Sequence, residues 1–167
     1  TREHNIPTLG ICLGMQCMAI EFARNVLGYA DANSTEFDPT TSHKVVDIME
    51  EQKNILNLGG SMRVGAYPCS LKKGTKVYEI YQTDNIYERH RHRFEFNNDY
   101  KEEFEKAGMI CSGINPASNL IETIELQSHN WYIGVQFHPE YHSTVVNPHP
   151  LFISFIKAAI EKQNKKI

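Results

Sequence analysis

The sequence predicts an α/β fold in which helices flank an open central sheet. Apolar residues recur at helical spacing near the start of the chain, between Met15 and Val26, and again near its end, from about Leu151. Between these two stretches lie several runs rich in β-branched and apolar residues, which are typical of strands. At 167 residues, the chain has the length of a single domain. Strands enclosed by helices indicate the α/β class.

The first two predicted elements are a buried strand and an amphipathic helix. Ile6–Cys12 is a short apolar run that contains β-branched residues, which favours a strand. It leads directly into the helix, and Gly28 stands where a helix-ending glycine is expected. The residues at helical spacing are Met15, Met18, Ala19, Phe22, Ala23 and Val26.

The middle of the chain reads as strands separated by loops and turns. A polar loop from Asp31 to about Ser42 precedes predicted strands at Lys44–Met49 and Gly59–Leu71. Lys72–Thr75 is a turn.

The second half begins with a short charged helix at Asp99–Ala107. Three strand-like runs follow, at Met109–Ile114, Leu120–Leu126 and Trp131–Phe137. The closing helix is expected to gather its apolar residues on one face. These are Leu151, Phe152, Phe155, Ile156, Ala159 and Ile160.

Composition narrows the class of protein. The chain is 41% hydrophobic and 22% charged, which suits a soluble globular domain. A formal net charge of −3 argues against a nucleic-acid binder, because polyanions recruit basic proteins. No run approaches the ~18–20 apolar residues of a membrane span. We therefore expect no nucleic-acid or membrane partner and a cytoplasmic location.

The four cysteines are Cys12, Cys17, Cys69 and Cys111, and no two of them form a C-x-x-C pair. A zinc ribbon or a thioredoxin-type motif is therefore not expected. We interpret them as reduced thiols, one of which is a candidate nucleophile.

Cys12 is that candidate, because it stands in a G-x-C-x-G motif at residues 10–14, between the first strand and the first helix. This is the thiol form of the nucleophile elbow, a sharp turn whose flanking glycines let strand and helix approach closely. The positive end of the helix is expected to favour the thiolate. The backbone N–H of Leu13 lies where an oxyanion would form. The other three cysteines lack flanking glycines, so we interpret them as structural.

A thiol nucleophile needs a general base, and the base needs a group that fixes its tautomer. His138 ends a strand-like run and is followed by Pro139 and Glu140. Active sites of open α/β sheets lie at strand ends, and the rigid proline fixes the geometry of the His–Glu pair. We therefore predict that Cys12, His138 and Glu140 form a catalytic triad.

The run of alternating Arg and His at residues 89–93 supports competing readings. On a strand, Arg89, Arg91 and Arg93 would share one face, and His90 and His92 the other. A metal site on the histidines, a nucleic-acid patch and a solvated charged strand all remain open from the residues alone. No further ligand stands at a recognisable spacing, so we predict no metal.

These motifs resemble those of the class I glutamine amidotransferases, whose fold is flavodoxin-like. The matching segments are residues 10–16 and 136–140. Further segments resemble the glutaminase domains of the CTP synthase family in particular, and the resemblance covers nearly the whole chain. They are residues 31–37, 59–65, 88–95 and 148–152.

The resemblance implies hydrolysis of L-glutamine to glutamate and ammonia through a γ-glutamyl thioester on Cys12. It implies that Gln16 contacts the bound glutamine, that Glu36 binds its ammonium and that Arg93 binds its carboxylate. The last two roles also suit the substrate, because free glutamine is a zwitterion and Arg binds carboxylates bidentately.

The resemblance also implies partners. Residues 1–167 would form a glutaminase domain that lacks its N-terminal strands and its amidoligase domain, and would be weakly active or inactive alone. The complete enzyme would use ATP and Mg²⁺ to aminate UTP to CTP, with GTP as effector, and would form a homo-oligomer. No cofactor is expected in this domain. The alternatives are a non-catalytic fragment that binds partner domains, and a thiol γ-glutamyl hydrolase or peptidase on the same fold.

Overall fold

A computed structural model describes residues 1–48 and 62–165 of the chain. The elements agree with the predicted α/β class. They are β1 (Thr8–Ile11), α1 (Leu13–Asn25), β2 (Asn33–Ser34), β3 (Lys44–Ile48), β4 (Arg63–Leu71), α3 (Lys76–Tyr81), β5 (Asn85–His92), β6 (Phe94–Phe96), η2 (Asn98–Tyr100), α4 (Lys101–Lys106), β7 (Met109–Ile114), β8 (Ile121–Leu126), β9 (Tyr132–Val135), η3 (Pro139–His142) and α5 (Pro150–Asn164).

The described strands form a six-stranded sheet in the order β1-β9-β8-β7-β4-β5 and a small sheet in the order β2-β3-β6. In the large sheet, β1 and β9 run parallel and the other neighbours are antiparallel. Because β1 and β9 are parallel, their carboxyl ends meet at one edge of the sheet. Cys12 follows β1 and His138 follows β9 at this edge.

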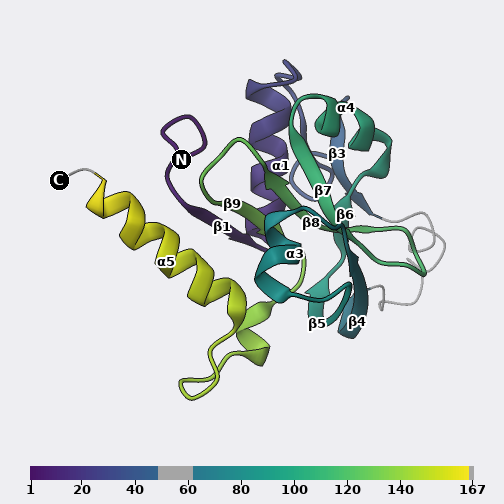
Figure 1. The fold of residues 1–167 in the computed structure, drawn as a ribbon. Helices are drawn as coiled ribbons and strands as arrows, with labels where there is room; N and C mark the ends of the chain where they lie inside the picture. Colours follow the sequence, from purple (N-terminus) through teal and green to yellow (C-terminus); the bar gives the residue numbers. More distant parts are fainter. Residues whose placement is uncertain (49–61, 166–167) are drawn as a thin grey trace.

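Helices pack against both faces of the large sheet (Figure 1). One core joins α1 and α4 to the sheet, and Phe22 and Phe104 meet there with ring centroids 5.3 Å apart. The other joins α3 and α5 to the opposite face through Val77 and Leu151. Adjacent residues of β9 serve the two cores, since Tyr132 belongs to the first and Ile133 to the second. The sheet is therefore covered on both sides, as predicted.

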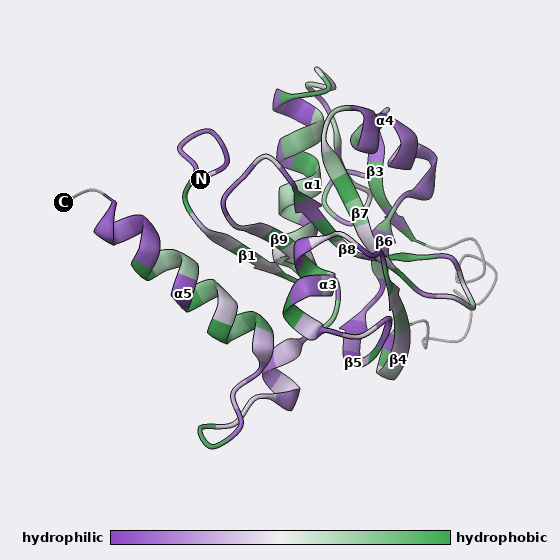
Figure 2. Cartoon of the chain, in the orientation of Figure 1, coloured by the Kyte–Doolittle hydropathy of each residue, from purple (hydrophilic) through white to green (hydrophobic). Residues whose placement is uncertain are grey.

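The predicted apolar face of the last helix is wrong in part. Leu151 is buried, and Phe155 packs on Trp131 with ring centroids 5.3 Å apart. Ile156 and Ile160, however, are 55% and 52% exposed. The side of α5 that meets the sheet is set by Leu151 and Phe155, and the isoleucines lie away from it. Figure 2 shows the resulting hydrophobic positions along α5.

Other predicted boundaries hold to within a few residues. The strands at Lys44–Met49 and Gly59–Leu71 correspond to β3 and β4, although Met49 and residues 59–61 lie outside the described residues. No described helix is long and apolar enough to cross a membrane.

Candidate active site

Cys12 occupies a strained turn between β1 and α1. Its backbone has φ 51° and ψ −106°, in a region that residues other than glycine rarely adopt. Its N–H donates to the carbonyl oxygen of Val135 at 2.8 Å, and its carbonyl accepts from the N–H of Gln16 at 3.3 Å. These bonds tie the turn to β9 on one side and to α1 on the other, so the sulfur is held at the carboxyl edge of the sheet.

Gly10 lets α1 start directly against β1. A Cβ on Gly10 would overlap Sδ of Met18 and would lie 2.8 Å from the carbonyl carbon of Gly14. Gly14 differs, because among the described residues nothing lies within 4 Å of the position its Cβ would take. Only the first glycine of the motif is thus required by close packing in the described part of the chain.

The sulfur of Cys12 is partly buried, and burial raises the pKa of its thiol. The backbone N–H of Leu13 and the side chain of Gln136 lower that pKa by hydrogen bonding, whereas the charges of Glu140 and Glu95 raise it further. The backbone N–H at the start of α1 thus favours the thiolate, but the pKa of the thiol is raised overall. Desolvation outweighs the hydrogen bond from Leu13, and a base is needed to remove the proton.

His138 and Glu140 are in direct contact. Nδ1 of His138 lies 2.6 Å from Oε1 of Glu140, so Nδ1 carries a proton and donates it to the carboxylate. In the neutral imidazole, Nε2 is then free to accept a proton. The backbone N–H of His138 donates to the carbonyl oxygen of Arg89 in β5 at 2.8 Å, which anchors the start of η3 to the sheet.

The remaining predicted residues converge on one cleft of about 400 Å³ beside Cys12. Leu13 and Gln16 enter it from α1, Glu36 from the segment after β2, and Arg93 from the link between β5 and β6. Segments far apart in sequence thus bring a carboxylate and a guanidinium to the same space as the candidate nucleophile. His138 and Glu140 lie beside this cleft rather than in its lining. The other lining residues are Phe37, Met62, Arg91, His92 and Phe94.

Sequence reasoning gave no role to Gln136, which the structure places against the nucleophile. Its Nε2 donates to Sγ of Cys12 at 3.6 Å, and its Oε1 accepts from Nε2 of Gln16 at 3.3 Å. Gln16 also donates to the carbonyl oxygen of Phe94 at 2.8 Å, which ties the cleft wall to α1. The available signal was a glutamine inside an apolar run, where a buried amide requires hydrogen-bond partners.

The charged strand at residues 89–93 divides its faces as alternation predicts. His90 and His92 are buried, whereas Arg89 and Arg91 are exposed. The histidines contact each other, with Nδ1 of His90 2.7 Å from Nε2 of His92. Among the described residues, no group of three or more His, Cys, Asp or Glu side chains could hold a metal.

Below the cleft, the two histidines join a buried charged cluster. It consists of Arg63, His90, His92, Glu95 and Glu122. Arg63 donates to Oε1 of Glu122 at 2.7 Å and lies 3.6 Å from Oε1 of Glu95. Burial is the largest cause that raises the pKa of Glu95, to about 8. Burial likewise lowers the pKa of His92 to about 3. The cluster therefore holds neutral imidazoles close to the cleft wall.

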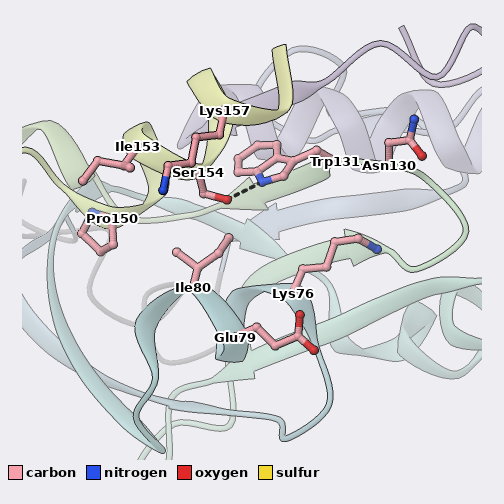
Figure 3. A pocket seen from close by; sticks show the side chains of 9 residues that line it. All are labelled: Lys76, Glu79, Ile80, Asn130, Trp131, Pro150, Ile153, Ser154 and Lys157. Atoms are coloured by element: carbon pink, nitrogen blue, oxygen red, sulfur yellow. Dashed lines mark hydrogen bonds between the residues drawn. The ribbon is translucent and has the colours of Figure 1, made fainter. Parts of the chain in front are cut away.

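A second cleft, of about 460 Å³, opens between α3 and α5 (Figure 3). Trp131 forms part of its wall and donates from Nε1 to Oγ of Ser154 at 2.8 Å. Lys76 and Lys157 reach it from the two helices. It contains none of the predicted site residues. The cleft at Cys12 is therefore the one that combines a nucleophile with groups for substrate recognition.

The other cysteines lie apart from this chemistry. Cys17 is exposed on α1, whereas Cys69 and Cys111 are buried. Burial raises the pKa of the Cys69 thiol strongly and that of the Cys111 thiol to about 12, so both keep their protons. Their environments suit structural residues.

Comparison with known proteins agrees with this geometry. Residues 1–158 match the family described as glutamine amidotransferase class-I. The CTP synthase of Bacteroides fragilis is 72% identical over 162 residues, covering 97% of this chain and 30% of the relative. That of Hydrogenobaculum sp. is 68% identical over 158 residues, covering 95% of this chain and 30% of the relative. The chain thus spans about 30% of the length of these relatives.

Solved structures also resemble this chain. The glutaminase domain of Trypanosoma brucei CTPS with bound acivicin has a TM-score of 0.90 and 40% identity, covering 96% of this chain and 62% of that one. A glutamine amidotransferase from Thermotoga maritima, at 19% identity and a TM-score of 0.50, covers 99% of this chain and 51% of that one, and shares the fold. The predicted fold class and the resemblance to CTP synthase glutaminase domains are confirmed. The chain belongs to the class-I glutamine amidotransferase family.

Proposed function

We propose that this chain hydrolyses L-glutamine to L-glutamate and ammonia. The observation that carries the proposal is the cleft at Cys12, which places a thiol on a strained turn beside a carboxylate and a guanidinium. Free glutamine carries an ammonium and a carboxylate at one end and an amide at the other. Glu36 binds the ammonium, Arg93 binds the carboxylate, and the amide carbon then lies toward Cys12.

The reaction begins at the thiol, which is protonated because its pKa is raised. Nε2 of His138 accepts this proton while Glu140 holds Nδ1 and stabilises the imidazolium. The sulfur bonds to the amide carbon of glutamine, and the backbone N–H of Leu13 donates to the oxyanion that forms. The imidazolium then protonates the amide nitrogen, the C–N bond breaks and ammonia leaves.

The second half of the reaction releases glutamate. His138 takes a proton from water, and the resulting hydroxide attacks the thioester carbon. The C–S bond breaks, the proton returns to sulfur, and Cys12 is regenerated. Gln16 and Gln136 support both halves by fixing the cleft wall and the position of the sulfur.

We further propose that the ammonia is consumed by an amidoligase domain. The 72% identity to a CTP synthase supports the amination of UTP to CTP in the complete enzyme, driven by ATP and Mg²⁺. GTP as effector, a homo-oligomeric assembly and a cytoplasmic location belong to the same proposal. In this proposal, residues 1–167 act as the glutaminase domain of the complete enzyme.

Two alternatives make different demands on the cleft. A γ-glutamyl hydrolase or peptidase binds an extended substrate, so the convergence of Glu36 and Arg93 on one small space favours the free amino acid. A non-catalytic binding module needs no strained cysteine, and the backbone of Cys12 argues against it.

Labelling of the complete enzyme with a glutamine-mimicking diazoketone tests the proposal. We expect peptide mass spectrometry to find the adduct on Cys12 alone, and Cys12→Ser to abolish both the adduct and glutamine-dependent ammonia release. Cys17→Ser is the matched control, because Cys17 is exposed on the same helix and should leave labelling unchanged. Adducts spread over several cysteines, or labelling that survives Cys12→Ser, would overturn the assignment.

A further inference from the structure

Glu88 is a buried carboxylate that receives side chains from three separate elements. It lies in β5 and is 3% exposed. Its Oε1 accepts from the hydroxyl of Tyr81 in α3 at 2.8 Å and lies 2.8 Å from Nε2 of His149, the N-cap of α5. Its Oε2 lies 3.1 Å from Nδ1 of His142 in η3. A carboxyl group this deeply buried is thus bonded through both of its oxygens, as buried polar groups require.

The geometry of this cluster shows which atoms carry the protons. Nδ1 of His149 accepts from the backbone N–H of Leu151 at 3.3 Å, so Nε2 carries the proton and donates to Glu88. Burial and the charge of Glu88 raise the pKa of the Tyr81 hydroxyl, which therefore remains a donor. Glu88 accepts from both, and from Nδ1–H of His142. Three donors thus converge on one carboxyl group.

The contact with His142 links this cluster to the catalytic pair. η3 is four residues long, begins immediately after His138 and contains Glu140. Its start is held by the bond from the N–H of His138 to the carbonyl oxygen of Arg89, and its last residue by the contact of His142 with Glu88. Neighbouring residues of β5 thus fix the two ends of the segment that presents both members of the pair.

The catalytic pair needs this support because it is otherwise exposed. The side chain of Glu140 is 46% exposed, and η3 is followed by a segment whose Val145 and Val146 are 100% and 97% exposed. A short 3₁₀ helix provides few hydrogen bonds of its own. The 2.6 Å contact between Glu140 and His138 thus depends on where β5 holds the helix.

We infer that Glu88, acting through His142, is a positioning residue that keeps Glu140 on Nδ1 of His138. The inference rests on the proposed glutaminase function and deepens it. Removal of the His142 contact leaves every group that touches glutamine in place, but lets η3 move relative to the sheet. The His138 ring then spends less time in the orientation that accepts the proton of Cys12, so kcat falls while glutamine binding is retained.

A set of His142 variants of the complete enzyme tests this inference, because the side chain of His142 is 42% exposed and its replacement is compatible with folding. We expect His142→Ala to lower kcat for glutamine hydrolysis roughly tenfold or more, with KM for glutamine unchanged. His142→Asn places an amide N–H where Nδ1–H stood and should restore kcat. His142→Gln places its amide near the position of Nε2 instead, so it should not restore kcat.

Two further variants of the cluster complete the test. Glu88→Gln should reproduce the loss of kcat. Tyr81→Phe removes a donor from the same carboxylate on the α3 side, away from η3, and should leave kcat within about twofold of the wild type. The inference would be overturned if His142→Ala kept the kcat of the wild type. It would also be overturned if His142→Gln restored kcat as fully as His142→Asn. Absence of glutamine hydrolysis in the wild type would instead contradict the proposed function itself.

Discussion

At the scale of single residues, Cys12 shows how competing influences set the state of a nucleophile. Its position at the start of α1 and the N–H of Leu13 favour the thiolate, but burial raises the pKa of the thiol more than they lower it. The G-x-C-x-G pattern correctly indicated the turn, because the pattern is local. It could not indicate the burial, because the groups that surround the sulfur, such as Gln136, come from the other end of the chain.

The residues that recognise the substrate could likewise be predicted from the sequence only in part. A zwitterionic substrate requires opposite charges, and the resemblance to the amidotransferases selected Glu36 and Arg93 among 20 acidic and 17 basic residues. The structure places both in the cleft of Cys12. It also places His92 and Phe94 there, which nothing in the sequence indicated, because they reach the cleft through the pairing of β6 with β3 and of β5 with β4.

Substitutions at the two ends of the cleft should separate binding from chemistry in the complete enzyme. We expect Arg93→Ala mainly to raise KM for glutamine, because the substrate carboxylate loses its partner. We expect His138→Ala mainly to lower kcat, by roughly 10²–10⁴, because a positioned base is lost. Steady-state ammonia release measures both constants.

The control for these substitutions is Lys157→Ala, which removes a cation from the cleft between α3 and α5 and should change neither constant. CTP formation from added ammonia should survive Arg93→Ala and His138→Ala, because it bypasses this site. An unchanged KM in Arg93→Ala would show that its assigned role is wrong.

At the scale of elements, the strands of the second half and the short helix α4 were predicted well, whereas α3 was missed. β7, β8 and β9 lie within the predicted runs, because apolar and β-branched patterns are properties of each segment alone. α3 is only six residues long, and although Thr75 caps it locally, part of its first turn is bonded by a distant strand. The hydroxyl of Thr75 accepts from the N–H of Tyr78 at 3.2 Å, and the buried carboxylate of Glu125 accepts from the N–H groups of Lys76 and Val77 at 2.9 and 3.0 Å. A cap supplied by a distant strand leaves no local sequence signal.

The two glycines of the elbow yield a prediction at this scale. A methyl group at Gly10 would overlap Sδ of Met18 and the backbone of Gly14, so Gly10→Ala should force α1 away from β1. We expect overpacking to cost about 1–3 kcal/mol of unfolding free energy and to lower glutaminase activity, since Cys12 lies in the turn between the two elements. Urea denaturation and ammonia release measure the two effects.

Gly14→Ala is the matched variant. A Cβ there contacts no described residue, and alanine has the higher helix propensity. We expect its unfolding free energy to equal or exceed that of the wild type by up to about 1 kcal/mol. Equal destabilisation by both substitutions would contradict the packing argument, because only Gly10 faces a steric conflict.

At the scale of the whole molecule, a buried charged cluster unites strands that the sequence shows as separate runs. Arg63 belongs to β4, His90 and His92 to β5, Glu95 to β6 and Glu122 to β8. The cluster therefore connects the large sheet to the small one beneath the cleft. Sequence alternation correctly put the histidines on the face opposite the arginines, but only the pairing of the strands shows that this face is buried and which charged groups surround it. The general cost of burying ionised groups explains why burial raises the pKa of Glu95 and lowers that of His92.

The cluster predicts how the stability of the molecule depends on pH. The ordinary pKa of a glutamic acid is 4.5, and burial raises that of Glu95 to about 8 in the folded state. Between these values the folded protein holds a proton that the unfolded chain has released. The stability from Glu95 is thus fully present below pH 4.5 and is lost as pH rises toward 8, with a slope of at most about 1.4 kcal/mol per pH unit.

The buried histidines have the opposite effect on stability, and they have it at lower pH. Burial lowers the pKa of His90 to about 2 and that of His92 to about 3, from an ordinary value of 6.5. The unfolded chain therefore binds protons that the folded protein does not, and stability falls as pH drops below 6.5. This contribution levels off about one pH unit above 6.5. Because Glu95→Gln keeps both histidines, comparison with that variant separates the effect of Glu95 from theirs.

Glu95→Gln keeps the shape of the side chain but has no proton to release. We therefore expect the unfolding free energy of the wild type to decrease between pH 6.5 and 8 relative to the unfolding free energy of this variant. Urea denaturation at half-unit steps of pH gives both curves, and their difference cancels every group that the two proteins share. Glu3→Gln, at an exposed carboxylate near the start of the chain, is the control and should follow the wild type. Parallel curves for the wild type and Glu95→Gln would mean that Glu95 is already ionised at pH 6.5, with Arg63 compensating its charge as well as that of Glu122.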